Sequence, residues 1–170
     1  MVTMKELYFS AVPEKLSCAR RLNERYGPDL LALPGMREKL HNLEVLSQAL
    51  QRQMAGMAMF SLCKACAEKV GGGCCSAYMA NETDALLLLL NMLLGVEVAS
   101  QRDDSFECCY LGPQGCTLRV KPIFCLNYNC HHILTGNTSA VVKNLEKAAS
   151  AVLLDQTAVE KILLRHILSR

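Results

Sequence analysis

Apolar residues recur every three or four positions along most of the chain, which is the spacing that places them on one face of an α-helix. The longest such run predicts one long helix from about Met36 to Lys69, and another predicts a helix from about Ser139 to the C-terminal end. A third run, from Asp84 to about Ala99, is apolar on nearly every side and predicts a buried central helix. Residues 3–26 predict one or two short helices. The pattern therefore indicates an all-α fold, a helical bundle.

Turn and capping residues indicate where these helices begin and end. Gly27-Pro28 and Pro34-Gly35 predict a connection before the long helix, since proline removes a backbone donor and glycine relaxes the backbone. Asp84 is the expected N-cap of the central helix. The polar run Thr135–Ser139 supplies a turn and an N-cap for the last helix, and a break of that helix near Asp155 stays open.

Composition narrows the class of protein. With 170 residues, 51% of them apolar, the chain can bury one sizeable core, so we expect a single domain over residues 1–170. A net charge of +2 with both signs interspersed gives no nucleic-acid footprint. The most apolar stretch, Ala85–Val98, includes Asn91 and Glu97 and is too short to cross a bilayer of ~30 Å. Since Met1–Pro13 lacks a signal-peptide pattern, we expect a cytoplasmic location without a membrane span.

Ten cysteines in a chain of this size need an explanation. Five disulfides are disfavoured in a reducing cytoplasm, whereas clustered cytosolic thiols are typical of metal sites. Cys18 stands apart in a predicted helix and is expected to be a small buried side chain. An early and a late group together supply eight candidate metal ligands: Cys63, Cys66, Cys74, Cys75, Cys109, Cys116, Cys125 and Cys130.

The early group has a spacing that suits shared ligation. Cys63 and Cys66 are three residues apart on a predicted helix, so their Cβ atoms lie ~5–6 Å apart on one face. The glycines at 71–73 then break the helix and turn the chain into Cys74 and Cys75. Adjacent side chains diverge, so this pair can serve two sites or bridge two metals, and one packed as a core thiol is the alternative. The eight thiols divide naturally into two four-cysteine sites.

The late group lies on a segment rich in turn residues, from Cys108 to Cys130. Because Pro122 cannot sit inside a helix or a central strand, we expect an irregular loop with few regular hydrogen bonds, around which the helices are wrapped. Clustered thiolates on a metal would fix such a loop. Arg119 and Lys121 are candidate counter-charges for the thiolates.

These motifs resemble the zinc- or iron-chelating cysteine-cluster proteins known as the YkgJ-like family. The resemblance covers about residues 60–132 and departs from the family in its longer gap before the cysteine pair, in Lys121 where arginine is usual, and in Cys108 as an extra thiol. It implies cysteine-ligated metal binding. The motifs that show the resemblance are Cys63-x2-Cys66, Cys74-Cys75, Cys109-Tyr-Leu, Gly115-Cys116, Lys121-Pro122 and Cys125-x4-Cys130.

The spacing also bears on which metal is bound. Gaps of six, eight and four residues in the late group are irregular, as in iron–sulfur proteins, whereas zinc favours paired Cys-x2-Cys knuckles. We therefore expect one or two iron–sulfur clusters, in electron transfer or in a redox accessory subunit, and keep a zinc-stabilised structural or interaction module as the alternative. Apolar neighbours suited to shielding a cluster are Leu111, Val120, Ile123, Phe124 and Leu126.

Two further functions have weaker support. Eight methionines and ten cysteines raise the hypothesis of copper storage, but most thiols lie outside predicted helices, which counts against it. An enzyme would need a catalytic motif, and no phosphate loop or Rossmann fingerprint is present. His131 and His132 follow Cys130 directly, and they more simply flank the metal site than form a catalytic dyad.

Overall fold

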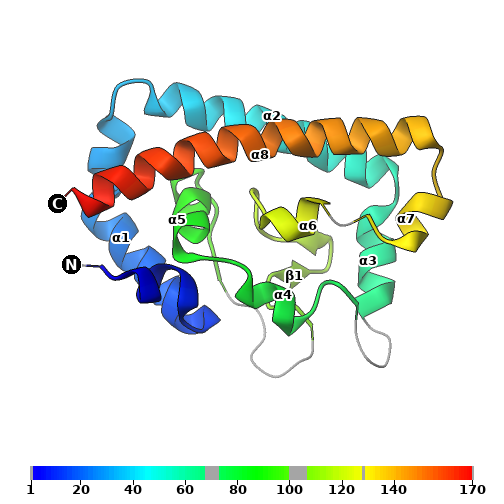
Figure 1. Ribbon diagram of the computed structural model, residues 1–170, viewed down its shortest axis with the longest axis horizontal. Helices are drawn as coiled ribbons and strands as arrows, with labels where there is room; N and C mark the ends of the chain where they lie inside the picture. The colour runs from blue at the N-terminus through cyan, green and yellow to red at the C-terminus, as the bar shows by residue number, and fades with distance from the viewer. Residues whose placement is uncertain (1, 68–72, 100–106, 128, 170) are drawn as a thin grey trace.

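Two long helices, α2 (Met36–Gly56) and α8 (Ser139–Leu168), lie side by side and run in opposite directions along the long axis of the molecule (Figure 1). Helix makes up 72% of the structure and strand 4%, which confirms the all-α prediction. The computed structural model describes residues 2–67, 73–99, 107–127 and 129–169.

The contact between α2 and α8 is built from buried residues at steps of three and four. Such alternation is typical of long helices that pack at a shallow angle with interlocking side chains. On α8 it continues past Asp155, so the helix has no break there. On α2 the buried residues are Met36, Leu40, Leu43, Ser47, Leu50 and Met54. On α8 they are Val142, Leu145, Ala149, Val152, Gln156, Val159, Leu163 and Ile167.

The first long helix, α1 (Val12–Ala32), continues through Gly27-Pro28, so the predicted connection at this pair is wrong. Proline removes a helical hydrogen bond, but Tyr26 and Leu30 on either side of it are both buried in the core, and their packing holds the helix together. The chain turns instead at Pro34-Gly35, as predicted there. Gly35 has a φ of 72°, which glycine adopts without strain.

The predicted single helix from Met36 to Lys69 is two helices in the structure. α2 ends at Gly56, and α3 (Met59–Ala67) leaves it at a sharp angle (Figure 1). Ala58 lies between them with a φ of 53°, in the left-handed region. The apolar pattern continues across this bend because the methionines on both sides of Ala58 are buried, so periodicity alone does not reveal it. Lys69 lies outside the described residues.

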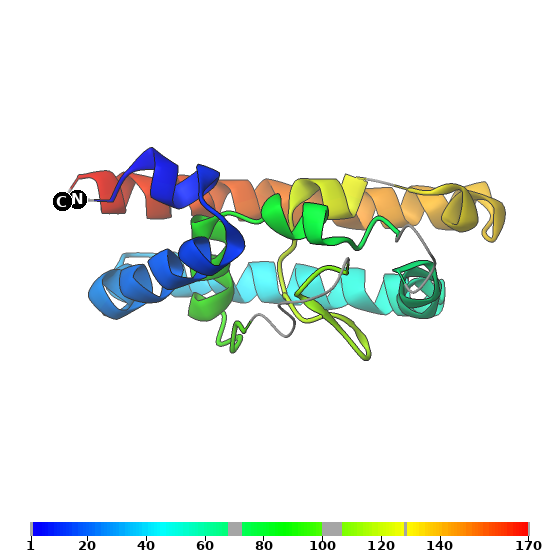
Figure 2. The same ribbon diagram turned by 90° about the horizontal axis from the view of Figure 1, so that it is seen from below.

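The predicted central helix is α5 (Ala85–Leu93), which contacts α1 and α8 and lies between the layers that they form (Figure 2). Asp84 is its N-cap, as predicted, and accepts a hydrogen bond from the backbone N–H of Leu87 at 2.8 Å. The helix ends at Leu93 rather than near Ala99, because Gly95 turns the chain with a φ of 77°. None of the described helices combines the length and the apolar character needed to cross a bilayer.

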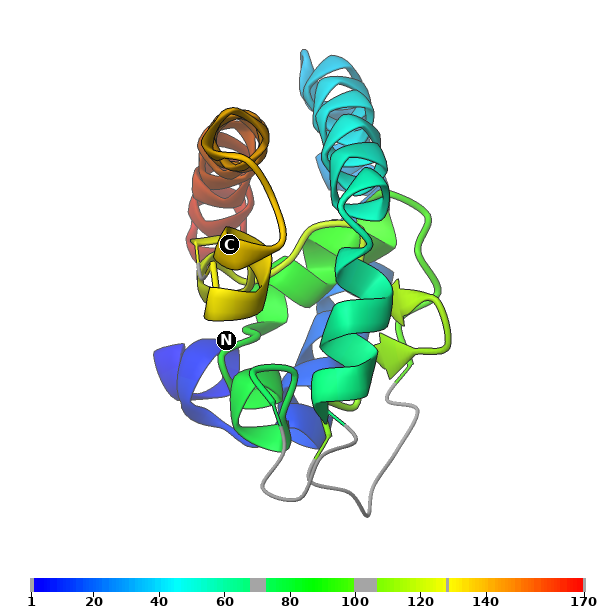
Figure 3. The same cartoon turned by 90° about the vertical axis from the view of Figure 1, so that its right-hand side faces the viewer.

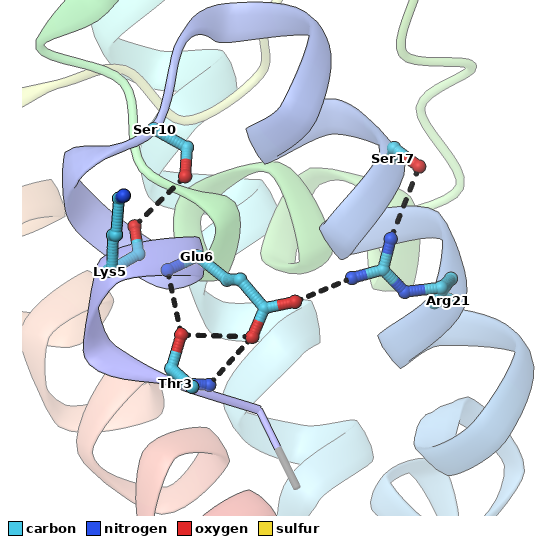
Figure 4. A network of polar contacts seen from close by, with 6 residues as sticks. All are labelled: Thr3, Lys5, Glu6, Ser10, Ser17 and Arg21. Atoms are coloured by element: carbon cyan, nitrogen blue, oxygen red, sulfur yellow. Dashed lines mark hydrogen bonds and ion pairs between the residues drawn. The ribbon is translucent and has the colours of Figure 1, made fainter.

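The N-terminal segment packs onto α1 through a short π-helix, η1 (Lys5–Phe9). Two helices therefore begin within residues 3–26, as predicted, but α1 is not short and continues to Ala32. Glu6 receives hydrogen bonds from the N–H and the hydroxyl of Thr3, both at 2.9 Å, and pairs with Arg21 of α1 at 3.1 Å (Figure 4). Hydrogen bonds from Thr3 lower the pKa of Glu6. Because these groups are exposed, the network orients η1 more than it stabilises the fold.

Short elements connect the long helices, and the cysteines other than Cys18 lie on these elements, on α3 or in the chain between them. Leu111 pairs with Cys116, and Gly112 with Gly115, in an antiparallel hairpin. Apart from Cys18 on α1, the thiols therefore lie away from the long helices. The short elements are α4 (Ala77–Asn81), β1 (Leu111–Gly112), β2 (Gly115–Cys116), α6 (Ile123–Asn127) and α7 (His131–Thr135).

Candidate metal centre

The early and late cysteine groups meet through a backbone contact next to α4. The N–H of Cys108 donates to the carbonyl oxygen of Cys75 at 3.0 Å, and Ser76 pairs with Glu107 in an antiparallel bridge. Since Cys74 and Cys75 end the early group and Cys108 begins the late segment, this contact brings the two groups together. The central helix α5 lies between them in sequence without keeping them apart.

Six thiols line one cavity of about 310 Å³, which we call the inner cavity. Its volume corresponds to roughly ten water molecules at ~30 Å³ each. The thiols come from both groups: Cys63, Cys74, Cys75, Cys108, Cys116 and Cys125. Apart from Lys121, the rest of the wall is glycine, apolar side chains and thioethers: Met54, Met59, Phe60, Met79, Leu111, Gly115, Phe124 and Ile133. Among the described residues, the lining of the inner cavity is thus rich in sulfur and largely apolar, with Lys121 as its cationic group.

A second cavity of about 280 Å³ adjoins the first, and we call it the outer cavity. It shares Cys63 and Cys74 with the inner cavity. His131 and His132 also line it and are exposed, so this compartment is more open to water. Its full lining is Leu62, Cys63, Cys66, Cys74, Cys130, His131, His132 and Ile133.

The adjacent pair Cys108 and Cys109 faces in two directions. Cys108 lines the inner cavity, whereas Cys109 is 8% exposed and belongs to the hydrophobic core. The sequence resemblance pointed to Cys109 and treated Cys108 as an extra thiol, so Cys108 is the candidate ligand that it missed. Cys109 and Tyr110 lie in a turn, in which the N–H of Leu111 donates to the carbonyl oxygen of Cys108 at 2.9 Å, and the spacing of the cysteines does not reveal this turn. Cys18 is buried in α1, as expected.

The segment from Cys108 to Cys130 is more regular than the predicted irregular loop. It contains the hairpin, and α6 begins directly after Pro122, where proline does not interrupt a helix. The hairpin packs closely against α3 (Figure 3). At Gly115, φ is 101° and a Cβ would lie 2.5 Å from the Phe60 ring, so only glycine fits. Cys116 is thereby held next to the helix that carries Cys63.

Gly73 allows the chain to pass directly over Cys66. A Cβ at this position would lie 2.8 Å from the Cys66 sulfur and 3.0 Å from its carbonyl carbon, closer than real Cβ atoms approach. The absence of a side chain is therefore what returns the chain to α3 and places Cys74 beside Cys63. The other two glycines of the predicted break, Gly71 and Gly72, lie outside the described residues.

The thiols of Cys63, Cys74 and Cys75 interact through hydrogen bonds with one another. Hydrogen bonds from Cys63 and Cys75 hold the pKa of Cys74 far below the usual thiol range, because they stabilise its thiolate. The same contacts raise the pKa of Cys75, and the bond with Cys74 raises that of Cys63. The trio thus favours one thiolate flanked by two thiols, and it attracts a cation that can take up that charge.

Elsewhere in the inner cavity, burial keeps the Cys108 thiol protonated. Desolvation raises its pKa to about 12. Because a metal ligand must be a thiolate, metal uptake here has to displace protons and supply compensating positive charge.

Lys121 is the charged side chain of the inner cavity and is only 4% exposed. Burial lowers its pKa, while the nearby thiols of Cys116 and Cys125 act in the opposite direction. The other predicted counter-charge, Arg119, has a different place. Its Nε lies 3.3 Å from Glu44 Oε2, and it donates to Gln51 at 3.2 Å, so it ties the segment to α2. Of these two predicted counter-charges, only Lys121 lines the inner cavity.

As the side chains stand, no group of three or more histidine, cysteine or acidic residues is arranged to hold a metal ion, in the part of the chain that the structure describes. The thiols line the walls of the cavities, so ligation requires them to close onto the ion. Cysteine reaches different positions by rotation about one χ1 bond, and such rotation involves no rearrangement of the backbone.

The chain matches no protein-family model, no curated protein and no solved structure. Its likeness to the YkgJ-like family therefore stays a prediction from the cysteine motifs. Function has to be inferred from the residues of the two cavities.

Proposed function

We propose that this protein holds an iron–sulfur cluster in the inner cavity and acts in electron transfer or as a redox accessory subunit. The observation that carries the proposal is the convergence of six thiols, from two distant parts of the chain, on one cavity of about 310 Å³. Structural thiols buried singly in a core have no reason to gather in this way. Soft sulfur ligands select iron–sulfur clusters, zinc and copper(I).

The residues of the inner cavity fit an iron–sulfur cluster. Four thiols line this cavity and not the outer one, and they would hold the iron: Cys75, Cys108, Cys116 and Cys125. Such a cluster supplies one-electron chemistry, with a potential set by net charge, hydrogen bonds and exposure. Lys121 offsets part of the negative charge, and the apolar wall keeps water from the sulfur atoms.

The position of the cavity near the surface supports a redox role. Cys125 is an exposed residue, and Phe124 beside it is 56% exposed although it also lines the cavity. A centre here would have only one layer of side chains between it and a partner. Electron transfer to a docked redox protein needs this proximity, whereas a purely structural metal does not.

The decisive experiment is analysis of protein produced with ample iron and purified without air. We expect iron and acid-labile sulfide in stoichiometric amounts, with the broad visible absorption of iron–thiolate charge transfer. Cys116→Ser should lose most of the iron, and Cys18→Ser is the matched control that should keep it. Stoichiometric zinc without iron or sulfide would overturn the proposal in favour of the zinc-stabilised module.

A second candidate, copper(I) binding, is favoured by one specific observation. Three thioethers, from Met54, Met59 and Met79, line the same cavity as the thiols. Thioether and thiolate together are the preferred donors of copper(I). Anaerobic titration with copper(I) against a competing chelator tests this. If the protein binds copper(I), replacing all three methionines with leucine should weaken copper(I) binding and leave the iron content unchanged.

A further inference from the structure

The two cavities share part of their thiol lining but not all of it. Cys63 and Cys74 line both, so they form a common wall. Cys66 and Cys130 line the outer cavity alone. The four remaining thiols of the inner cavity do not reach the outer one: Cys75, Cys108, Cys116 and Cys125. The eight cavity thiols therefore divide into two sets of four, one on each side of the common wall.

We propose that the outer cavity is a second, separate metal site that takes a single zinc ion. The ligands are the two thiols of the common wall and the two that line the outer cavity alone: Cys63, Cys66, Cys74 and Cys130. This inference rests on the proposed function, because it assigns the inner thiols to the iron–sulfur cluster. Four sulfur ligands around one ion is the composition of structural zinc sites.

The backbone supports this set of ligands. Cys63 and Cys66 are one helical turn apart on α3, which gives one half of the site. The close passage of Gly73 over Cys66 brings Cys74 to the same place from the other side. Cys130, the residue before α7, completes the set. The site thus ties α3, the chain before α4 and the start of α7 together.

Local polarity explains why zinc suits the outer cavity and the cluster suits the inner one. The outer cavity carries exposed imidazoles, and Cys74 is an exposed residue, so the net charge of −2 on a tetrathiolate zinc site is solvated. The inner cavity has Lys121 and an apolar wall instead. Zinc has no redox chemistry, so it can hold Cys63 and Cys74 of the common wall in place while the neighbouring cluster changes charge.

The division also accounts for the adjacent pair Cys74 and Cys75. Their thiols are in hydrogen-bond contact with each other, but Cys75 lines only the inner of the two cavities, whereas Cys74 lines both. The pair therefore supplies one ligand to each site.

The test uses the full-length protein, reconstituted without air with iron and sulfide and then titrated with Zn²⁺, or with Co²⁺ as a spectroscopic substitute. Two double variants are compared. Cys66→Ser with Cys130→Ser removes ligands of the outer site alone, and Cys108→Ser with Cys116→Ser removes ligands of the inner site alone. Circular dichroism checks that each variant keeps its helices, and Cys18→Ser is the control.

We expect wild type to bind one zinc ion in addition to the cluster. The outer variant should keep iron and sulfide and bind zinc more than about 100-fold more weakly. The inner variant should lose the cluster and still bind one Co²⁺ with tetrahedral thiolate absorption. Loss of the cluster and the zinc together in both variants, or no zinc in wild type beyond the cluster, would overturn the second site. Zinc in the outer site without iron or sulfide in wild type would overturn the cluster and leave the zinc site standing.

Discussion

The side chain of Asn91 hydrogen-bonds both backbone polar groups of Val120. Its Nδ2 donates to the Val120 carbonyl oxygen at 3.0 Å, and the Val120 N–H donates to its Oδ1 at 3.2 Å. Asn91 also accepts from the N–H of Arg119 at 2.7 Å and donates to Leu87 at 2.9 Å, and it is fully buried. The amide thereby mimics a strand partner for the residues that precede Lys121, and it fixes them to α5.

Replacement of Asn91 by alanine should destabilise the protein by about 2–4 kcal/mol, because it leaves buried backbone groups of Arg119 and Val120 without partners. Chemical denaturation measures this loss. Asn137→Ala is the matched control, since Asn137 makes a single half-buried bond to Ile133 at 2.9 Å. We expect it to cost about 1 kcal/mol or less. Equal losses in the two variants would contradict a special role for Asn91.

Gly73→Ala should reduce metal content while leaving the long helices intact. The added methyl group would collide with the sulfur and the backbone of Cys66, so Cys74 would be displaced from the shared wall. Gly56→Ala is the control, because a Cβ at Gly56 meets nothing within 4 Å. Metal analysis and circular dichroism, measured on the same samples, separate the two effects. Full metal content in Gly73→Ala would show that the close approach is not needed for ligation.

Removal of the Lys121 charge should lower the reduction potential of the bound cluster. The ammonium lies in the thiol cavity and is 4% exposed, so it stabilises the more negative reduced state. Anaerobic redox titration of Lys121→Ala against wild type measures the shift. Arg119→Ala removes the same charge from a side chain that pairs with Glu44, and it should shift the potential much less. A larger shift in Arg119→Ala would rule out Lys121 as the tuning charge.

Glu160 should make the stability of the protein depend on pH. Burial raises its pKa from 4.5 to about 7 in the folded state, with nearby Asp84 acting in the same direction. The folded protein therefore binds a proton more readily than the unfolded chain, so stability falls as pH rises from about 4.5 through 7 and stays low above it. Glu160→Gln should add about 1–3 kcal/mol at pH 8 and little at pH 4.

The helices could be predicted from the sequence wherever one face is buried along the whole element. α8 and α5 follow directly from their apolar patterns and from capping by Thr138 and Asp84. The bend at Ala58 could not be predicted, because the residues on both sides of it are apolar and buried. Continuation through Pro28 was also hidden, since burial of its neighbours outweighs a lost hydrogen bond.

The candidate site was predictable in composition and less so in arrangement. Seven of the eight predicted ligands line the two cavities, and Cys109 lies in the core while Cys108 takes a place in the inner cavity. Spacing identifies the thiols but does not define which way each one faces in the turn from Cys108 to Leu111. Asn91 was noted only as a polar residue in an apolar helix, because its partners are about 30 positions away in sequence.

The bend between α2 and α3 has a consequence for how the metal site is assembled. If α2 continued straight, each residue would advance 1.5 Å, and Cys63 would lie about 10 Å beyond Gly56 along the α2 axis. Instead the left-handed turn at Ala58 directs α3 across the end of the bundle, toward the hairpin. The bend at Ala58 therefore decides whether the α3 cysteines face the hairpin across the inner cavity. A β-branched residue at position 58 would oppose that angle, and Cys63 and Cys66 would then be left apart from Cys74, Cys75 and the late group.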